Sequence, residues 1–393
     1  MSPVIRACPS LTIQPLSLDL AKKSLLGAEV ILSSDLPQLI SPQNLTPEDV
    51  SVLRQALYDH SVLVIKKQKG IEPSTLPQLA KIWDEKIVDM HSGGSKAVTD
   101  PKNILSRNAA VRTPSCRNVT VIGNGQFDGY MGIEKLNLIH VNHTEFHETP
   151  LSYHEIENGQ TRFYRWHMDM PCYETLPGKV TLIHGIEIPK APDQKVVFED
   201  GSILPLTAGA TAFVSGALAF SLLSPEEQIF ALNTVVQYAP RPYEWIRNCK
   251  ATSDGLTIAG AGNEIPLDEL PPWKLENVQS HPMVWRNPGR PSQPHLQILG
   301  ACVRSLKTTD SLTGESSSID DLDEVRRICR SLMKKAISAD YIYAHAWEEG
   351  DLVIFHNQGV LHSITGQLKD EKRLLWQCTM ASSAPPEKLA TEW

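Results

Sequence analysis

Several signatures of common protein classes are missing from this 393-residue sequence. It contains no G-x-x-x-x-G-K-[ST], no G-x-G-x-x-G after a predicted strand and no G-x-S-x-G. NTP hydrolysis, dinucleotide chemistry and serine-hydrolase chemistry therefore lack their usual motifs. No apolar run is long enough to span a bilayer, and the N-terminus has no basic region followed by a long apolar segment. We expect a soluble cytoplasmic protein with no membrane partner.

Cysteine pairs at metal-binding spacing and an excess of basic residues are also absent. The seven cysteines are widely spread and include no C-x-x-C, which argues against a disulfide framework or a thiolate zinc site and suits a reducing compartment. Lys and Arg number 37 against 45 Asp and Glu, for a formal net charge of −8. Because a general nucleic-acid binder needs a basic face that displaces counterions, we expect no nucleic-acid partner. The sequence leaves the oligomeric state open, a homo-oligomer included.

Strand patterns dominate the sequence after residue 160, where apolar and β-branched runs lie between Gly and Pro turns. Two helices are predicted, at 46–60, where Thr46 is the N-cap, and at 319–337. Because most strands follow one another without a helix between them, we expect a β-sandwich or barrel with helices packed outside. The predicted strands are 27–32, 61–67, 161–169, 179–189, 209–216, 341–347, 350–357 and 373–380.

We expect a single domain over residues 1–393, because no repeat, low-complexity tract or long linker forces a boundary. Residues 90–160 differ from the rest of the chain in being rich in Gly, His, Asn and Thr, with few apolar runs. This composition predicts a loop-rich insert at about 90–160, made either of long functional loops or of a poorly ordered segment.

A candidate metal site is formed by three residues near the ends of predicted strands. In "TRFYRWHMD" (161–169), His167 and Asp169 are two positions apart, so they project from the same face of a strand. Such a pair arises easily by chance in a chain with 13 histidines, so a third ligand has to support it. His362 supplies one, just past a strand and turn. Two imidazoles and one carboxylate leave three positions of an octahedral ion open, as in non-haem Fe(II) sites that bind a cosubstrate and O₂.

Arg373 is the second candidate, eleven residues after His362 at the start of the strand "RLLWQCTM". A guanidinium inside a barrel needs an anionic partner to offset its desolvation. Its planar fork is suited to a carboxylate. A dicarboxylic cosubstrate that chelates the metal through one end would present its other carboxylate to Arg373.

Together these residues resemble the Fe(II)/2-oxoglutarate-dependent taurine/2,4-dichlorophenoxyacetate dioxygenase (TauD/TfdA) family, and within it the fungal xanthine dioxygenase branch. The resemblance implies a mainly β fold with flanking helices around a double-stranded β-helix (jelly-roll) core. It also implies oxidative decarboxylation of 2-oxoglutarate to succinate with Fe(II) and O₂, coupled to C–H oxidation of a small molecule. The resemblance covers nearly the whole chain. Segments that carry it include "TRFYRWHMD", "KVTLIHGIEIP", "TAFVSG", "HPMVWRNP", "YIYAHAWEEGDLVIFHNQGVLHS" and "RLLWQC".

The resemblance also implies roles for individual residues. His167, Asp169 and His362 are the implied catalytic iron ligands, and Arg373 is the implied partner of the distal carboxylate of 2-oxoglutarate. The family commonly adds a threonine for that carboxylate, and the corresponding stretch "IPKAPDQKVVF" (188–198) places Lys195 there. Lys195 either acts as a second cation for 2-oxoglutarate or points to solvent.

Substrate-binding positions depart from the xanthine branch. The xanthine enzymes carry a lysine where this chain has Ile139, which is apolar and does not pair with an anionic purine. Losing a charged contact to a buried ligand costs on the order of 2–5 kcal/mol. We therefore expect another small substrate, such as an amino acid or an intermediate of fungal specialised metabolism, that undergoes hydroxylation, desaturation or oxidative cyclisation. Conversion of xanthine to uric acid is the alternative. The other compared positions are Asn118 and Thr120, which replace glutamines, and Gln377 and Cys378, which are retained.

Three other interpretations compete with this one. His143 and Glu145 in "NHTEFH" form a rival ligand pair, although His140, His143 and His147 are more typical of a loop or pocket mouth. A cupin-like metallo-hydrolase or isomerase on the same barrel would need no buried clamp for a dicarboxylate, so Arg373 argues against it. A catalytically dead binding protein is disfavoured because all three ligands and the arginine are present.

Overall fold

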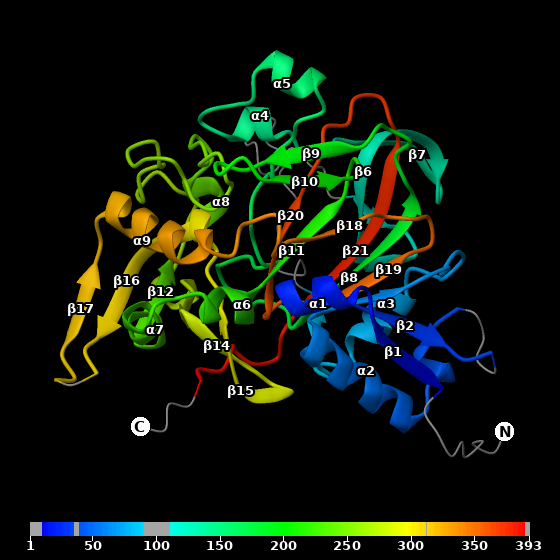
Figure 1. Ribbon diagram of the computed structural model, residues 1–393, viewed down its shortest axis with the longest axis horizontal. Coiled ribbons are helices and arrows are strands. Elements are labelled where there is room, and N and C mark those ends of the chain that lie inside the picture. Colours follow the sequence, from blue (N-terminus) through cyan, green and yellow to red (C-terminus); the bar gives the residue numbers. More distant parts are fainter. Residues whose placement is uncertain (1–9, 35–38, 90–110, 312, 390–393) are drawn as a thin grey trace.

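The computed structural model of this protein describes residues 10–34, 39–89, 111–311 and 313–389. A large sheet and a small sheet face each other across one apolar interior. A second lobe with its own sheet lies to one side of them (Figure 1). The predicted mainly β architecture with flanking helices is confirmed.

The large sheet has ten strands, and its central strands come from distant parts of the chain. Its hydrogen-bonded order is β1-β2-β3-β19-β8-β21-β6-β5, while β4 pairs with β21 and β7 pairs with β6. The strands are β1 (Leu11–Pro15), β2 (Ala28–Leu32), β3 (Val62–Ile65), β4 (Val88–Asp89), β5 (Val111–Thr113), β6 (Cys116–Tyr130), β7 (Ile133–Leu138), β8 (Val180–Glu187), β19 (Leu352–His356) and β21 (Arg373–Ala381).

Strand β19 shows why the centre of this sheet is a continuous apolar run. Val353 and Phe355 point into the interior between the two sheets, where they meet Phe213 of the small sheet. Leu352 and Ile354 point to the opposite face, into a core shared with residues of helices α2 (Pro47–His60) and α3 (Thr75–Ala80). Because both faces of the strand are covered, all of its residues are buried, and all except the last are apolar.

Helix α2 confirms the predicted start at residue 46. The Thr46 hydroxyl accepts a hydrogen bond from the Asp49 amide, and the Asp49 carboxylate accepts one from the Thr46 amide, which forms a capping box. Pro47 follows at the first helical position, where a missing N–H costs nothing. The helix ends at Ser61, whose φ of 55° turns the chain into β3.

The small sheet carries the open edge on which the site is built. It consists of β18 (Tyr343–His345), β11 (Thr211–Ser215) and β20 (Val360–Ile364), with β11 in the middle. Along the free edge of β20 runs the segment 163–169, joined through the bridges Phe163–Thr365 and His167–His362. The strand predicted at 161–169 is therefore extended chain held by isolated bridges instead of a regular strand.

The second lobe combines a four-stranded sheet with helix α9 (Leu322–Lys334), which confirms the helix predicted at 319–337. Its strands are β12 (Thr234–Tyr238), β13 (Ser280–Pro282), β16 (Val303–Thr309) and β17 (Ser316–Ile319). The shorter elements outside the two main sheets are α1 (Leu18–Ser24), α4 (His143–Phe146), α5 (Tyr153–Glu157), α6 (Gly216–Ser221), α7 (Pro225–Leu232), α8 (Pro242–Trp245), β9 (Gln194–Val197), β10 (Ile203–Leu206), β14 (Val284–Asn287) and β15 (Arg290–Leu296).

The prediction of a loop-rich insert at 90–160 is wrong for much of its length. Residues 90–110 lie outside the described part of the chain, but 111–138 form β5, β6 and β7, and β6 alone spans 15 residues. These strands complete the large sheet beside β21. Their polar composition hid them, although β6 buries residues 119–121 in a run and β7 buries Leu136 and Leu138.

No helix of the described residues is both long enough and apolar enough to cross a membrane.

Candidate active site

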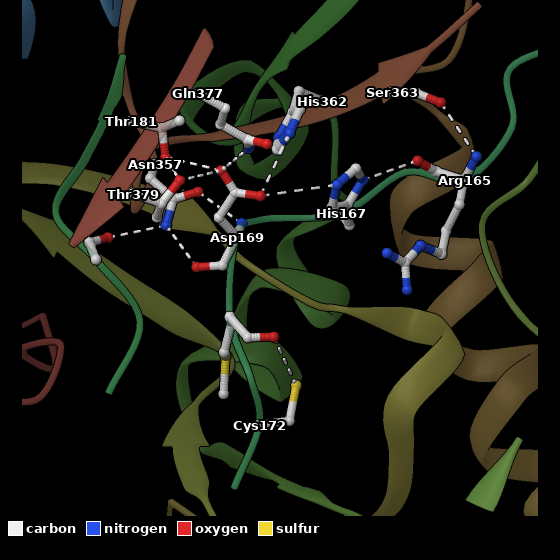
Figure 2. A network of polar contacts seen from close by, with 12 residues as sticks. Arg165, His167, Asp169, Cys172, Thr181, Asn357, His362, Ser363, Gln377 and Thr379 are labelled. Atoms are coloured by element: carbon white, nitrogen blue, oxygen red, sulfur yellow. Dashed lines mark hydrogen bonds and ion pairs between the residues drawn. The ribbon is translucent and has the colours of Figure 1, made fainter. Parts of the chain in front are cut away.

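Three residues predicted as metal ligands meet at one point of the structure. A nitrogen of His167, a nitrogen of His362 and a carboxylate oxygen of Asp169 all lie within 4.8 Å of one another. Among the described residues, this is the one group of three or more His, Cys, Asp or Glu that is arranged to hold a metal ion. Figure 2 shows the three side chains converging from two extended segments.

Backbone pairing brings the two histidines together. The amide of His167 donates to the carbonyl of His362 at 2.9 Å, and the amide of His362 donates to the carbonyl of His167 at 2.8 Å. Directly opposed residues of an antiparallel pair project to the same side. The two imidazole rings accordingly lie 4.1 Å apart between centroids. The 195-residue separation in sequence is thus closed at the histidines by a reciprocal pair of backbone hydrogen bonds.

The carboxylate of Asp169 divides its two oxygens between two tasks. Oδ2 accepts hydrogen bonds from the hydroxyls of Thr181 (2.8 Å) and Thr379 (2.9 Å) and from the amide of Gln377 (3.1 Å). Oδ1 faces the histidines (Figure 2). Asn357 fixes the backbone of Asp169, accepting from its amide at 2.7 Å and donating to its carbonyl at 2.9 Å. The carboxylate is therefore held in one orientation.

Both histidines have neutral side chains ready to act as ligands. Burial, the neighbouring His362 and the positive charge of Arg165 hold the pKa of His167 well below its usual value near 6.5. Burial also lowers the pKa of His362. The Nδ1 atom of His167 lies 3.0 Å from the carbonyl oxygen of Arg165, so Nδ1 carries the proton and Nε2 keeps its lone pair.

This arrangement fits a single divalent ion. Asp169 Oδ1 lies 3.9 Å from His167 Nε2 and 3.7 Å from His362 Nε2. Ligand atoms about 2.1 Å from a shared ion lie roughly 3–4 Å from one another. The side chains of His167 and Asp169 are 13% exposed and that of His362 is 4% exposed, so one side of the centre is open.

Arg373 lies buried at the start of β21 and has room for an anion. Its Nη2 donates to the carbonyl of Gly209 at 3.0 Å, while its buried Nε has no hydrogen-bond partner among the described residues. Burial lowers its pKa to about 10, so the guanidinium is charged at neutral pH. A side chain at Gly209 would approach Arg373 Nε to 3.0 Å, which explains the glycine. A small pocket beside Arg373 is also lined by His140 and Ile364.

The model of the family described as Taurine catabolism dioxygenase TauD, TfdA family matches residues 17–379. The chain belongs to this family. Its predicted class, an Fe(II)/2-oxoglutarate-dependent dioxygenase with Fe(II), 2-oxoglutarate and O₂ as cofactors, is confirmed, and it acts on a small molecule. The expected resemblance to the xanthine dioxygenase branch is confirmed as well.

Individual relatives differ in their named activities. The alpha-ketoglutarate-dependent xanthine dioxygenase xanA of Emericella nidulans is 39% identical over 377 residues, covering 95% of this chain and 97% of the relative. The alpha-ketoglutarate-dependent dioxygenase bsc9 of Alternaria brassicicola is 31% identical over 330 residues, covering 81% and 82%. A taurine dioxygenase from Burkholderia xenovorans, 16% identical, matches with a TM-score of 0.54 over 96% of this chain and 93% of its own. That match confirms the jelly-roll fold.

Of the two alternatives for Lys195, the geometry favours a side chain turned away from the cosubstrate. The preceding residue, Gln194, exchanges hydrogen bonds with the backbone of Gln367 at 2.9 Å, close to Gly209 and Arg373. Neighbouring residues of a strand face opposite sides, so Lys195 points away from this side of β9. The structure places Gln194 near the Arg373 pocket in place of the predicted lysine.

The predicted substrate residues do not all share one side of the sheet. Gln377 contacts Asp169, and Thr120 of β6 lies directly opposite Gln377 in the register, so both face the interior. Cys378 faces the other way and is buried in the core under α2 and α3, so its assignment to the substrate site was wrong. Asn118, two residues before Thr120, is half-buried on the same side of β6 as Thr120.

Ile139 and the rival ligand pair both lie apart from the metal centre. Ile139 is 57% exposed and lines the pocket beside Arg373. His143 lies on the short helix α4, with its Nε2 2.6 Å from the side-chain amide of Gln367, and joins no metal-binding group among the described residues. The interpretation of His143 and Glu145 as metal ligands is thus not supported.

Three residues that support the site were missed in the sequence. Thr181, Thr379 and Asn357 hold Asp169, yet each looks like an ordinary polar residue in a strand or turn. The alternation in "RLLWQCTM" gave a usable signal, because it places Thr379 on the same face as Gln377.

We predict that Thr379→Val weakens metal binding by about 10- to 100-fold, the usual cost of removing a residue that orients a metal ligand. The substitution keeps the shape of the side chain and removes one donor to Asp169 Oδ2. Titration of the apoprotein with Fe(II) or Mn(II) measures the change. Thr308→Val is the matched control, since it removes a similar hydroxyl, 3.1 Å from Thr234 Oγ1, in the second lobe. Equal affinities in the two variants would contradict the assignment.

Proposed function

We propose that His167, Asp169 and His362 hold Fe(II), that Arg373 binds the distal carboxylate of 2-oxoglutarate, and that the oxidised substrate is a small molecule other than xanthine. The observation that carries the proposal is the meeting of two neutral imidazoles with the unused oxygen of one anchored carboxylate. Iron and 2-oxoglutarate, when bound, supply the oxidation of a C–H bond by O₂ with release of succinate and CO₂.

The residues of the chain contribute orientation and protection in this scheme. The three donors on Asp169 Oδ2 prevent the carboxylate from rotating, so Oδ1 is kept for the metal. The rings of Phe355 and Phe213, at 4.8 and 6.2 Å from the His362 ring, keep water from the inner side of the centre. The open side at His167 and Asp169 is where cosubstrate, O₂ and substrate meet.

Arg373 suits the cosubstrate because its charge has no anionic partner in the described chain. A buried guanidinium without a counter-ion is costly, and a carboxylate is the ligand that best matches its planar donors. The carbonyl of Gly209 and the close approach of its Cα fix the guanidinium in place. A cosubstrate carboxylate would complete its hydrogen bonds at Nε.

Cellular context and organisation are also part of the proposal. Five of the described cysteines, Cys116, Cys172, Cys249, Cys302 and Cys329, are free thiols, which supports a reducing, cytoplasmic location. The family match over residues 17–379 supports a single domain. A homo-oligomer stays open in this proposal.

We predict that His167→Ala and Asp169→Ala reduce substrate-free succinate formation to the enzyme-free background, because each removes a metal ligand. The assay uses apoprotein supplied with Fe(II), ascorbate and 2-oxoglutarate, with succinate measured by chromatography. His154→Ala, which changes an exposed imidazole on α5, should retain the wild-type rate. Unchanged succinate formation in both ligand variants would refute the metal assignment.

We predict that Arg373→Gln raises the KM for 2-oxoglutarate by about 30-fold or more, which corresponds to a loss of about 2 kcal/mol for a charged contact. Metal affinity should stay near the wild-type value, because Arg373 does not contact the triad. Arg327→Gln, at a 69% exposed guanidinium on α9, is the control. A KM in Arg373→Gln that equals the control value would remove Arg373 from the cosubstrate site.

We predict that xanthine yields no uric acid above the background of the Asp169→Ala variant. Ile139 lines the Arg373 pocket as an apolar, exposed side chain that offers no charge to an anionic purine. The Emericella nidulans relative, assayed in parallel, is the positive control. The 39% identity to that enzyme favours xanthine as the second candidate, and uric acid formation at a rate comparable to the control would establish it.

A further inference from the structure

Arg165 lies on the same side of its segment as the two metal-binding residues. Along 164–169, Tyr164, Trp166 and Met168 are fully buried, whereas Arg165, His167 and Asp169 are half-buried. This alternation is that of an extended chain with one face in the core and one face toward an opening. Figure 2 shows the guanidinium of Arg165 next to His167, with no dashed contact to any of the other drawn side chains.

The guanidinium of Arg165 has no carboxylate partner in the described chain. Its Nε and Nη1 atoms are buried and make no hydrogen bond there. Elsewhere this protein supplies a carboxylate to a buried cation. Arg326 is 4% exposed and pairs with Glu264, and the half-buried Lys66 lies 3.0 Å from Asp351. Arg165 and Arg373 depart from that pattern.

Arg165 has a phenol and a thiol as neighbours, and its side chain hydrogen-bonds to that of Tyr243. Its guanidinium carbon lies 5.3 Å from the centroid of the Tyr243 ring, and the Tyr243 hydroxyl donates to the carbonyl of Met170 at 2.8 Å. Burial raises the pKa of Tyr243 and that of the Cys172 thiol well above their usual values, so neither supplies a negative charge at neutral pH. The ring of Tyr243 contacts the cation through its π face but does not neutralise it.

Arg165 and Arg373 act on different parts of the site. Arg165 lies beside the metal ligands, because His167 Nδ1 is 3.0 Å from the carbonyl oxygen of Arg165 and the Arg165 guanidinium lies next to His167 (Figure 2). The charge of Arg373 acts on His140 instead, at the mouth of the other pocket. Among the described residues, Arg165 and Arg373 thus offer two separate guanidinium groups without a carboxylate partner, whereas 2-oxoglutarate brings one distal carboxylate.

We propose that Arg165, with the ring of Tyr243 beneath it, binds a carboxylate of the substrate beside the metal, so that the substrate class is a small carboxylic acid. The inference rests on the proposed function, in which Arg373 is occupied by 2-oxoglutarate. A guanidinium held near the ligand pair would position the carbon chain of such an acid over the open side of the centre. The planar donors of arginine favour a carboxylate over a neutral amide of the same shape.

The test compares three acids with their primary amides: phenylacetate with phenylacetamide, hexanoate with hexanamide, and N-acetyl-leucine with N-acetyl-leucinamide. Each compound is titrated into the iron- and 2-oxoglutarate-loaded enzyme. The readout is the concentration of each compound at which the rate of succinate formation has undergone half of its maximal change. We expect at least one acid to act at a concentration ten-fold or more below that of its amide, and this ratio to fall to about one in Arg165→Gln. Arg165→Lys should keep part of the preference.

Controls separate this inference from the proposed function. Arg162→Gln, three residues away, should keep the preference for acids, and the KM for 2-oxoglutarate should be unchanged in Arg165→Gln. The inference is overturned if the wild-type enzyme shows no preference for any acid, if the preference survives in Arg165→Gln, or if a ten-fold excess of 2-oxoglutarate abolishes it. Absence of succinate formation in the wild-type enzyme would instead overturn the proposed function. If Arg165→Gln fails to fold, the comparison of wild type with Arg165→Lys decides.

Discussion

The site depends on one antiparallel backbone pair, between His167 and His362. Each residue donates its amide to the carbonyl of the other, and this pair fixes the separation and direction of both imidazoles before any metal binds. Residues 163–169 pair with the edge of β20 through two bridges, while on their other side the amide of Trp166 donates to the carbonyl of Gly255 at 2.9 Å. A slip of one residue would turn His167 and Asp169 into the core and bring Trp166 and Met168 to the opening.

Around this pair, one sheet supplies the groups that orient Asp169, and the other supplies the proposed histidine ligands. The large sheet supplies the groups that hold Asp169, from β8 and β21, while the edge of the small sheet supplies the histidines. The proposed metal centre therefore draws on both sheets. Arg165 and Arg373 have no carboxylate partner among the described residues, which is a costly arrangement for a protein that binds no anion there.

Much of this was accessible from the sequence, but only where a residue type limits the chemistry. His167, Asp169, His362 and Arg373 were predicted because few roles explain such residues at those places, and a family resemblance supported them. The side on which Lys195 and Cys378 point could not be predicted, because it depends on which of two alternating faces a strand buries. The face that a strand buries is set by its pairing with distant strands and cannot be read from a local sequence pattern. The strands at 111–138 were missed for a related reason, since their burial comes from β21 and not from their own composition.

The position of β21 has a consequence for how the enzyme is made. β21 is the last strand of the described chain, yet it lies between β8 and β6 in the middle of the large sheet. It carries Arg373, Gln377 and Thr379 into the site. During synthesis, β8 and β6 therefore wait with unpaired edges until some two hundred residues later in the chain. Assembly of the proposed iron site therefore depends on the insertion of β21 and is not complete when the segment that carries His167 and Asp169 emerges.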